Sequence, residues 1–204
     1  VPLLVRTDAA RPALLALAWR YGPSIAGPVA VSGAHFLASL LFLHSLGAAE
    51  FGIFSFVLVV SAFAMSVSGA GLVLPATRSM VKGDTATTGA VFRLALAAGL
   101  AFAAVRTLAT MASGATLSHA APLGLFGAVL AYRWFARSLA YIEGRIMAAI
   151  LSDLLYGAVV LPGLGAMELA HRTSLRLGGE LLLVAAAAGL VTFGGAFFRA
   201  QWRG

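Results

Sequence analysis

The stretch that decides the fold is residues 51–77, which read FGIFSFVLVVSAFAMSVSGAGLVLPAT. It holds no charged residue, and a helix needs about 20 mostly apolar residues to cross the hydrocarbon core of a bilayer. Because lipid offers no hydrogen-bond partners, a chain that crosses it forms helices or a closed barrel. The strands of a barrel alternate apolar and polar residues, and this run does not. The stretch therefore predicts a transmembrane helix.

The rest of the chain has the same character. Of its 204 residues, 61% are hydrophobic and 10% are charged, whereas a soluble domain carries about 25% charged residues. We expect an all-α fold, a polytopic membrane bundle of six transmembrane helices over residues 21–204, behind a cytoplasmic or interfacial segment over residues 1–20. The predicted spans are residues 24–46, 51–77, 88–110, 116–135, 146–166 and 180–199, and the fourth is the least apolar.

The basic residues indicate the orientation of the bundle. Of the 14 Lys and Arg residues, three fall on one side of the six spans, namely Arg106, Arg172 and Arg176, and eleven on the other. The positive-inside rule then places both termini in the cytoplasm, which agrees with an even number of spans. The net charge of +7 is spread between the apolar stretches, so membrane topology explains it and we expect no nucleic-acid partner.

Motifs for enzyme chemistry do not occur in the sequence. It has no phosphate-binding loop, no paired-histidine zinc helix and no nucleophile elbow. There is no cysteine, and the four histidines are scattered without the spacing of metal ligands. We therefore expect neither an enzyme, nor a cofactor, nor a metal site. Because the chain opens at Val1 and shows no signal peptide, we also expect it to be a piece of a longer protein.

Asp153 is the most informative acidic residue, because it lies within the fifth predicted span. A carboxylate is costly in a membrane and usually faces a bundle interior or a wet cavity. Two roles remain open for it. The first is a cation or proton site, as an ion-coupling or cavity carboxylate, and the second is a structural ion pair with Arg133 or Arg137.

Arg78 follows the glycines and the proline of residues 69–77, which loosen the end of the second span so that backbone groups can line a cavity. A guanidinium there can hold a phosphate through paired hydrogen bonds. Arg20, Arg93 and Arg106 allow the same interpretation. For each of the four, the alternative is an anchor that extends to the membrane interface.

Two stretches carry a family resemblance. The first stretch is residues 33–82. It contains LGAAEFGIF at residues 46–54, which is a Leu-Gly pair followed by a short spacer and an aromatic-Gly pair. It also contains Gly71-Leu72, followed by Ala76 and Arg78. In residues 137–156, a cytoplasmic connection with Arg145 leads into DLLY. These stretches, about a third of the chain, resemble the polysaccharide (O-antigen and exopolysaccharide) flippase family of the multidrug/oligosaccharidyl-lipid/polysaccharide exporter superfamily. His44-Ser45 departs from the small residue and Arg that often precede this Leu-Gly.

The resemblance implies the N-terminal lobe of a two-lobe transporter in a bacterial inner membrane. Such a protein turns an undecaprenyl-diphosphate-linked oligosaccharide from the cytoplasmic to the outer leaflet by alternating access. Its implied partners are this lipid-linked oligosaccharide, the bilayer, H+ or Na+ as the coupling ion, and polysaccharide polymerase machinery. Basic residues that face the cavity, with Arg78 the first candidate, would meet the diphosphate.

Two alternatives remain open at the level of the sequence. A drug or small-molecule exporter of the same superfamily would have a more acidic cavity. A non-transport membrane scaffold would need no cavity.

Overall fold

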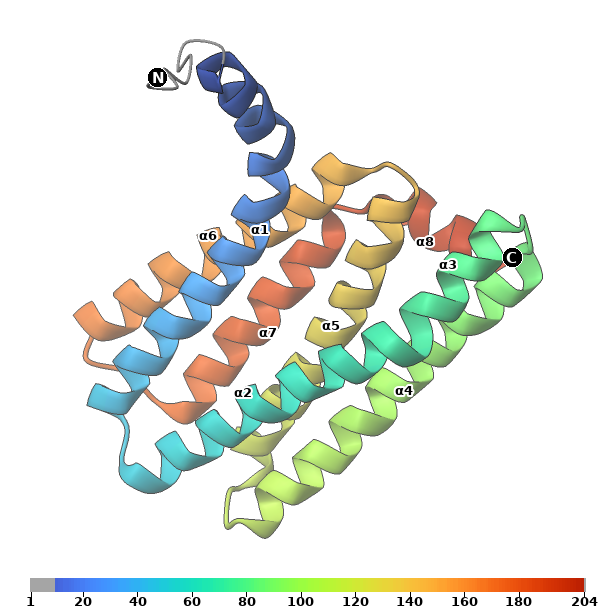
Figure 1. Ribbon diagram of the computed structural model, residues 1–204. Helices are drawn as coiled ribbons and strands as arrows, with labels where there is room; N and C mark the ends of the chain where they lie inside the picture. Colours follow the sequence, from blue (N-terminus) through green and yellow to red (C-terminus); the bar gives the residue numbers. More distant parts are fainter. Residues whose placement is uncertain (1–9, 204) are drawn as a thin grey trace, which may run out of the picture.

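The computed structural model describes the backbone of residues 10–203 and the side-chain surroundings of residues 25–202. Every regular element in this part of the chain is a helix, which confirms the predicted all-α class. The helices run back and forth as a bundle (Figure 1). Along the chain they are α1 (Ala10–Ser45), α2 (Ala48–Ser68), the π-helical turn η1 (Gly69–Val73), α3 (Leu74–Val81), α4 (Thr85–Ala112), α5 (Leu117–Ile142), α6 (Ile146–Leu169), α7 (Leu175–Val191) and α8 (Gly194–Arg203).

Short turns connect most of these helices. Only residues 46–47 separate α1 from α2, as the Leu-Gly turn predicts. Asp84 caps α4, since its Oδ1 accepts a hydrogen bond from the backbone N–H of Thr87 at 3.0 Å. Gly83 and Gly144 precede α4 and α6 with φ angles of +70° and +73°, which a residue with a Cβ rarely adopts. The tight turns before α2, α4 and α6 reverse the direction of the chain (Figure 1).

Four helical stretches are long and apolar enough to cross a membrane, namely Ile25–Ser45, Ala48–Val81, Thr85–Ala112 and Ile146–Leu169. They confirm the first, second, third and fifth predicted spans as apolar helices of span length. The second stretch comprises α2, η1 and α3 and has 34 residues, or about 51 Å. It is therefore much longer than a hydrocarbon core of about 30 Å, so it tilts or projects from it.

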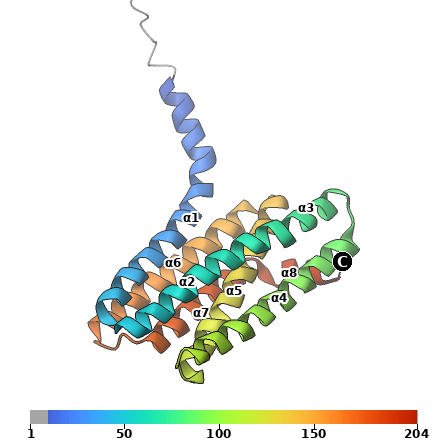
Figure 2. The ribbon, with the colours of Figure 1, turned by 60° about the horizontal axis from the view of Figure 1, so that its bottom comes forward.

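α5 occupies the fourth predicted span, but it does not have the apolar composition of the other four stretches. Its 26 residues, about 39 Å, are enough to cross. α5 packs against α4 and α7 most extensively, and also against α2 and α6, and it lies between them in two views (Figures 1 and 2). Because neighbouring helices cover much of α5, α5 tolerates polar residues that a helix facing lipid would not.

The span predicted over residues 180–199 is not one continuous helix. α7 ends at Val191, and α8 begins at Gly194 with a bend of 81° between the two helices. Gly194 has a φ of +77°, and α8 packs across α4, where Arg93 Nη1 donates to the carbonyl oxygen of Trp202 at 3.0 Å. The apolar composition continues through the bend, so hydropathy merges the two helices. At most, the pair makes one broken span, which brings the count to five.

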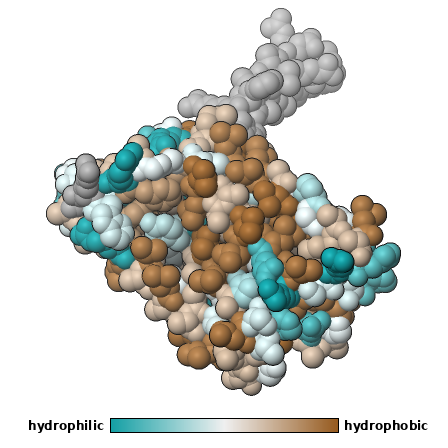
Figure 3. All heavy atoms as spheres, turned by 180° about the vertical axis from the view of Figure 1, so that it is seen from behind, coloured by the Kyte–Doolittle hydropathy of each residue, from teal (hydrophilic) through white to brown (hydrophobic). Residues whose placement is uncertain are grey.

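The boundary predicted at residue 20 falls within α1, where side-chain surroundings lie outside the described residues. Elsewhere, the outer surface of the bundle is rich in large apolar side chains. Val59 and Phe63 are each 68% exposed, and Leu108 is 66% exposed. On the face opposite to that of Figure 1, apolar side chains cover the middle and hydrophilic ones gather toward the two sides (Figure 3). A surface of this kind is suited to lipid or to another apolar partner.

Candidate functional site

A cluster of three buried charged side chains joins α5 to α6. Arg133 Nη2 donates to Asp153 Oδ1 at 2.5 Å, and Arg137 Nε donates to Asp153 Oδ2 at 2.7 Å. Arg133 and Arg137 lie one turn apart on α5, so both guanidinium groups reach the same carboxylate. Asp153 is 1% exposed, and the two arginines are 3% and 8% exposed. Of the two roles predicted for Asp153, the structural ion pair is therefore present, and it involves both candidate arginines.

Neutral polar side chains extend this cluster toward α1. Arg133 Nε donates to Ser152 Oγ at 2.9 Å, and its Cζ lies 4.8 Å from the centre of the Tyr156 ring. Tyr156 Oη and His35 Nε2 lie 2.6 Å apart. His35 is thus part of a hydrogen-bonded pair, and the described residues contain no group of three or more His, Cys, Asp or Glu side chains that could hold a metal ion.

Two glycines make room for the cluster. A Cβ at Gly27 of α1 would overlap the Asp153 carboxylate, and a Cβ at Gly189 of α7 would lie 2.6 Å from Arg133 Nε. Four helices therefore enclose three charges of which two are positive and one is negative. In a low dielectric such a cluster is stable only while every member stays paired. Since both Asp153 oxygens are engaged, a coupling ion or proton at this carboxylate would compete with the two arginines for it.

Arg106 is buried, and no acidic side chain of the described residues pairs with it. It is 2% exposed, and its Nη1 donates to Ser61 Oγ of α2 at 2.8 Å. Nε and Nη2 of this guanidinium, and Oγ1 of Thr110, are buried and have no hydrogen-bond partner among the described residues. Gly127 of α5 leaves the space that the guanidinium fills. Arg106 is therefore not the anchor at the membrane interface that the sequence allowed.

Of the other three predicted arginines, the two that lie among the described residues are both outside the two buried groups. Arg78, on α3, is exposed. Arg93 is also exposed, and it holds α8 through its hydrogen bond to Trp202. Arg20 belongs to the part of α1 whose side chains lie outside the described residues. Arg78, Arg93 and Arg106 therefore do not share one site among the described residues, and binding of a diphosphate by any of the four arginines stays a prediction.

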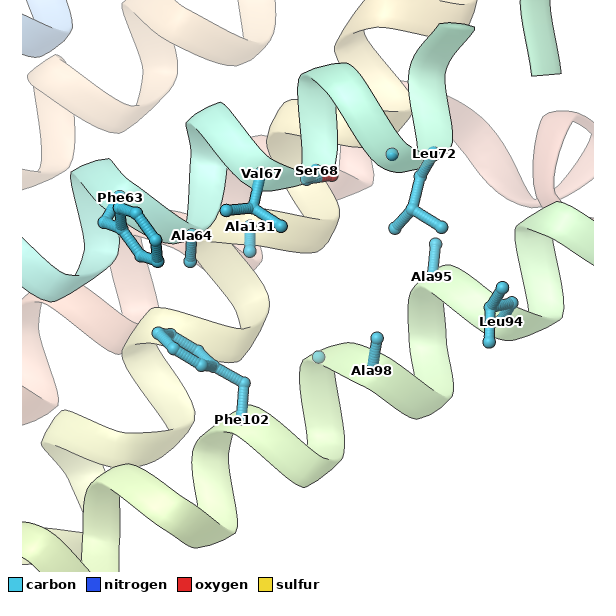
Figure 4. Close-up of a pocket in the computed structure, with 12 residues that line it drawn as sticks. Phe63, Ala64, Val67, Ser68, Leu72, Leu94, Ala95, Ala98, Phe102 and Ala131 are labelled. Carbon is cyan, nitrogen blue, oxygen red and sulfur yellow. The ribbon is translucent and has the colours of Figure 1, made fainter. Parts of the chain in front are cut away.

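An apolar groove of about 400 Å³ lies between the α2–η1 rod and α4, with α5 as its floor. Figure 4 shows its walls, with Phe63, Ala64 and Val67 on one side and Leu94, Ala98 and Phe102 on the other. The Phe102 ring extends from α4 toward α2 and closes one end of the groove (Figure 4). The groove arises because α2 and α4 both pack on α5 and scarcely touch each other.

Several residues of these sites were not expected from the sequence. His35 and Tyr156 are far apart in the chain, and Ser61 and Thr110 are common membrane-helix residues. A local signal exists only within single helices, where Arg133 and Arg137, like Arg106 and Thr110, are spaced by four residues on one face. Comparisons with protein-family models, with curated proteins and with solved structures find no match for this chain.

Proposed function

We propose that the chain is the N-terminal lobe of a two-lobe transporter that flips an undecaprenyl-diphosphate-linked oligosaccharide across a bacterial inner membrane. The observation that carries this proposal is the groove between α2, η1 and α4. Its wall is almost entirely apolar, as a polyprenyl chain requires, and Phe63 and Leu94 at its rim are exposed. A lipid-linked substrate needs such a path for its chain along the membrane-facing side of the protein.

The basic residues near one end of the groove suit the diphosphate. Arg78 follows η1 on the same continuous rod, and Arg93 adjoins the groove residue Leu94 on α4. Guanidinium groups bind phosphate oxygens through paired hydrogen bonds. No acidic residue lines the groove, which favours an anionic substrate over the cationic drugs of the alternative exporter.

In this proposal the lobe crosses the membrane six times. α5 is the fourth span, shielded from lipid by its neighbours, and α7 with α8 makes the last. Both termini are then cytoplasmic. Asp153 shapes the interior through its arginine pairs, and H+ or Na+ couples to transport only by releasing one of them.

The orientation is tested by single cysteines, since the chain has none of its own. Lys82→Cys and Arg172→Cys place a thiol at opposite ends of the bundle, and both positions are exposed. In intact spheroplasts, a membrane-impermeant maleimide should label Arg172→Cys alone, and it should label Lys82→Cys only after permeabilisation. The reverse pattern, or labelling of both from outside, would contradict the six-span topology.

The function is tested with Arg78→Ala in the full-length protein, expressed in a strain that lacks the native gene. We expect loss of surface polysaccharide and accumulation of the lipid-linked oligosaccharide, with normal protein levels in the membrane. Arg172→Ala is the matched control, because it removes one exposed arginine at the other end of the bundle. Unchanged export by Arg78→Ala would contradict the assignment of Arg78.

A further inference from the structure

Arg106 presents an unused pair of hydrogen-bond donors. Nη1 is engaged by Ser61, which leaves Nε and Nη2, the two nitrogens on one edge of the guanidinium. This edge is the one that binds two oxygens of a carboxylate or phosphate side by side. The unpaired Thr110 hydroxyl lies one helical turn away on the same face. Buried polar groups are almost always paired, so three unpaired atoms in one place call for an explanation.

These polar groups continue the apolar groove. Arg106 lies one turn beyond Phe102 and two turns beyond Gly99 on the same face of α4, and both of those residues line the groove. On α2, Ser61 lies one turn before Ala64, which lines the opposite wall. The Phe102 ring covers the guanidinium, with Arg106 Cζ 5.4 Å from the ring centre. Phe102, which lines one end of the groove, is thus also in contact with the Arg106 guanidinium.

Arg106 lies in the last third of α4, toward one end of the helix. α4 has 28 residues, or about 42 Å, which exceeds a hydrocarbon core of about 30 Å by about 6 Å at each end. Arg106 lies six residues, or about 9 Å, from the end of α4 at Ala112. Arg106 is thus nearer to the end of α4 than to its middle, and the groove lies on the side toward the middle of the helix.

We propose that the groove and Arg106 together bind an anionic amphiphile that enters from the bilayer. Its hydrocarbon chain lies between the α2–η1 rod and α4, and its carboxylate or phosphate head accepts hydrogen bonds from Nε and Nη2 of Arg106. The apolar wall and the unpaired cation complement the two ends of such a molecule. This site shares the groove with the polyprenyl chain of the proposed function, but its anionic head lies at the opposite end from Arg78 and Arg93, and it requires only that the bundle be embedded in lipid.

The test is lipid-induced thermal stabilisation of the full-length protein in a neutral detergent. The probes are oleyl phosphate, oleyl alcohol with the same chain and no charge, and inorganic phosphate as the head alone. We expect saturable stabilisation by oleyl phosphate only. Equal stabilisation by the alcohol would reduce the groove to nonspecific apolar contact, and equal binding of inorganic phosphate would exclude a role for the chain. Either result would overturn the proposal.

Variants separate the two halves of the site. Arg106→Met should weaken oleyl phosphate binding about tenfold or more, because two charge-assisted hydrogen bonds are lost. Ala98→Phe should block the chain from the rim of the groove, where Ala98 is exposed. The controls are Arg172→Gln, and Ala97→Phe at the neighbouring exposed position that does not line the groove. If Arg106→Met does not fold, Arg106→Lys keeps the charge without the paired donors and should also bind more weakly.

Wild-type affinity in the Arg106 variant that folds, or in Ala98→Phe, would overturn the proposal. The source of the amphiphile is identified by competition. Displacement of oleyl phosphate by phosphatidylglycerol would indicate a two-chain membrane phospholipid, and displacement by oleate alone would indicate a free fatty acid.

Discussion

In the charged cluster between α5 and α6, we expect the loss of Asp153 to destabilise the protein much more than the loss of Arg137. Asp153 alone balances two guanidinium groups, each in contact with a different carboxylate oxygen, and all three side chains are at least nine-tenths buried. Asp153→Asn removes the only negative charge and leaves two buried cations close together. Arg137→Met instead leaves Arg133 and Asp153 as a neutral pair, and it fills the vacated volume with a flexible apolar side chain.

The two changes should therefore differ greatly in cost. Removing one partner of a buried ion pair costs about 3–5 kcal/mol, and Asp153→Asn unpairs two arginines at once, so we expect a loss at or above the upper end of that range. For Arg137→Met we expect a change of roughly 1 kcal/mol or less, because the remaining pair is intact and a like-charge repulsion is relieved. The double variant that combines Asp153→Asn with Arg137→Met should be more stable than Asp153→Asn alone, because it lacks one of the two uncompensated cations.

The assay is the unfolding free energy of the purified protein, from dodecyl sulfate titration in mixed micelles followed by circular dichroism. Arg176→Met serves as the control, because the Arg176–Glu180 pair is largely exposed and should contribute little. If Arg137→Met destabilises the protein as much as Asp153→Asn, then the excess positive charge does not set the stability of the cluster, and the reasoning is wrong. The reasoning would also fail if the double variant were the least stable of the three.

Two further predictions concern packing and capping. A Cβ at Gly178 of α7 would overlap the fully buried Phe42 ring, so Gly178→Ala should destabilise the bundle by about 1–3 kcal/mol. Gly165→Ala is the control, because open space surrounds Gly165, and its unfolding free energy should be close to that of wild type. The same titration measures both variants, and equal costs would contradict the packing of Gly178 on Phe42. Hydrogen bonds from Thr87, first from its side chain and then from its backbone, lower the pKa of Asp84 below its ordinary value of 3.8. Asp84 should therefore stabilise α4 above about pH 3.8 and lose this effect as the pH falls through the lowered folded-state pKa. Asp84→Ala should be less stable than wild type at pH 7, and this gap should narrow at strongly acidic pH, where protonated Asp84 keeps only the neutral cap that Asp84→Asn also provides. A gap that does not depend on pH would contradict this account.

The helices and their turns could be predicted from local sequence. Long apolar runs, the turn at residues 46–47, the cap at Asp84 and the turn at Gly144 each depend on a few neighbouring residues, and the structure has all of them. Composition was also enough to predict the four stretches of span length, because a helix suited to lipid carries apolar residues on its exposed sides. Hydropathy did not predict the bend between α7 and α8, because it depends on composition alone and carries no information about the backbone conformation at Gly194.

The sites required the tertiary structure. Asp153 was recognisable as a costly buried carboxylate, but only the packing of α5 on α6 decides that both Arg133 and Arg137 reach it. Arg93 and Arg106 have similar apolar surroundings in the sequence, but Arg106 is buried against α2 and α5 whereas Arg93 is exposed.

The sequence by itself determined that this chain is a bundle of apolar helices, since helix formation and lipid compatibility follow from local composition. The tertiary structure decided which helix is central, where the last apolar stretch bends, which charges are paired and where the groove lies. Each of these depends on contacts between residues far apart in the chain. Alanine-rich and glycine-rich helices present similar surfaces on every side, so their sequence does not specify which face meets which neighbour.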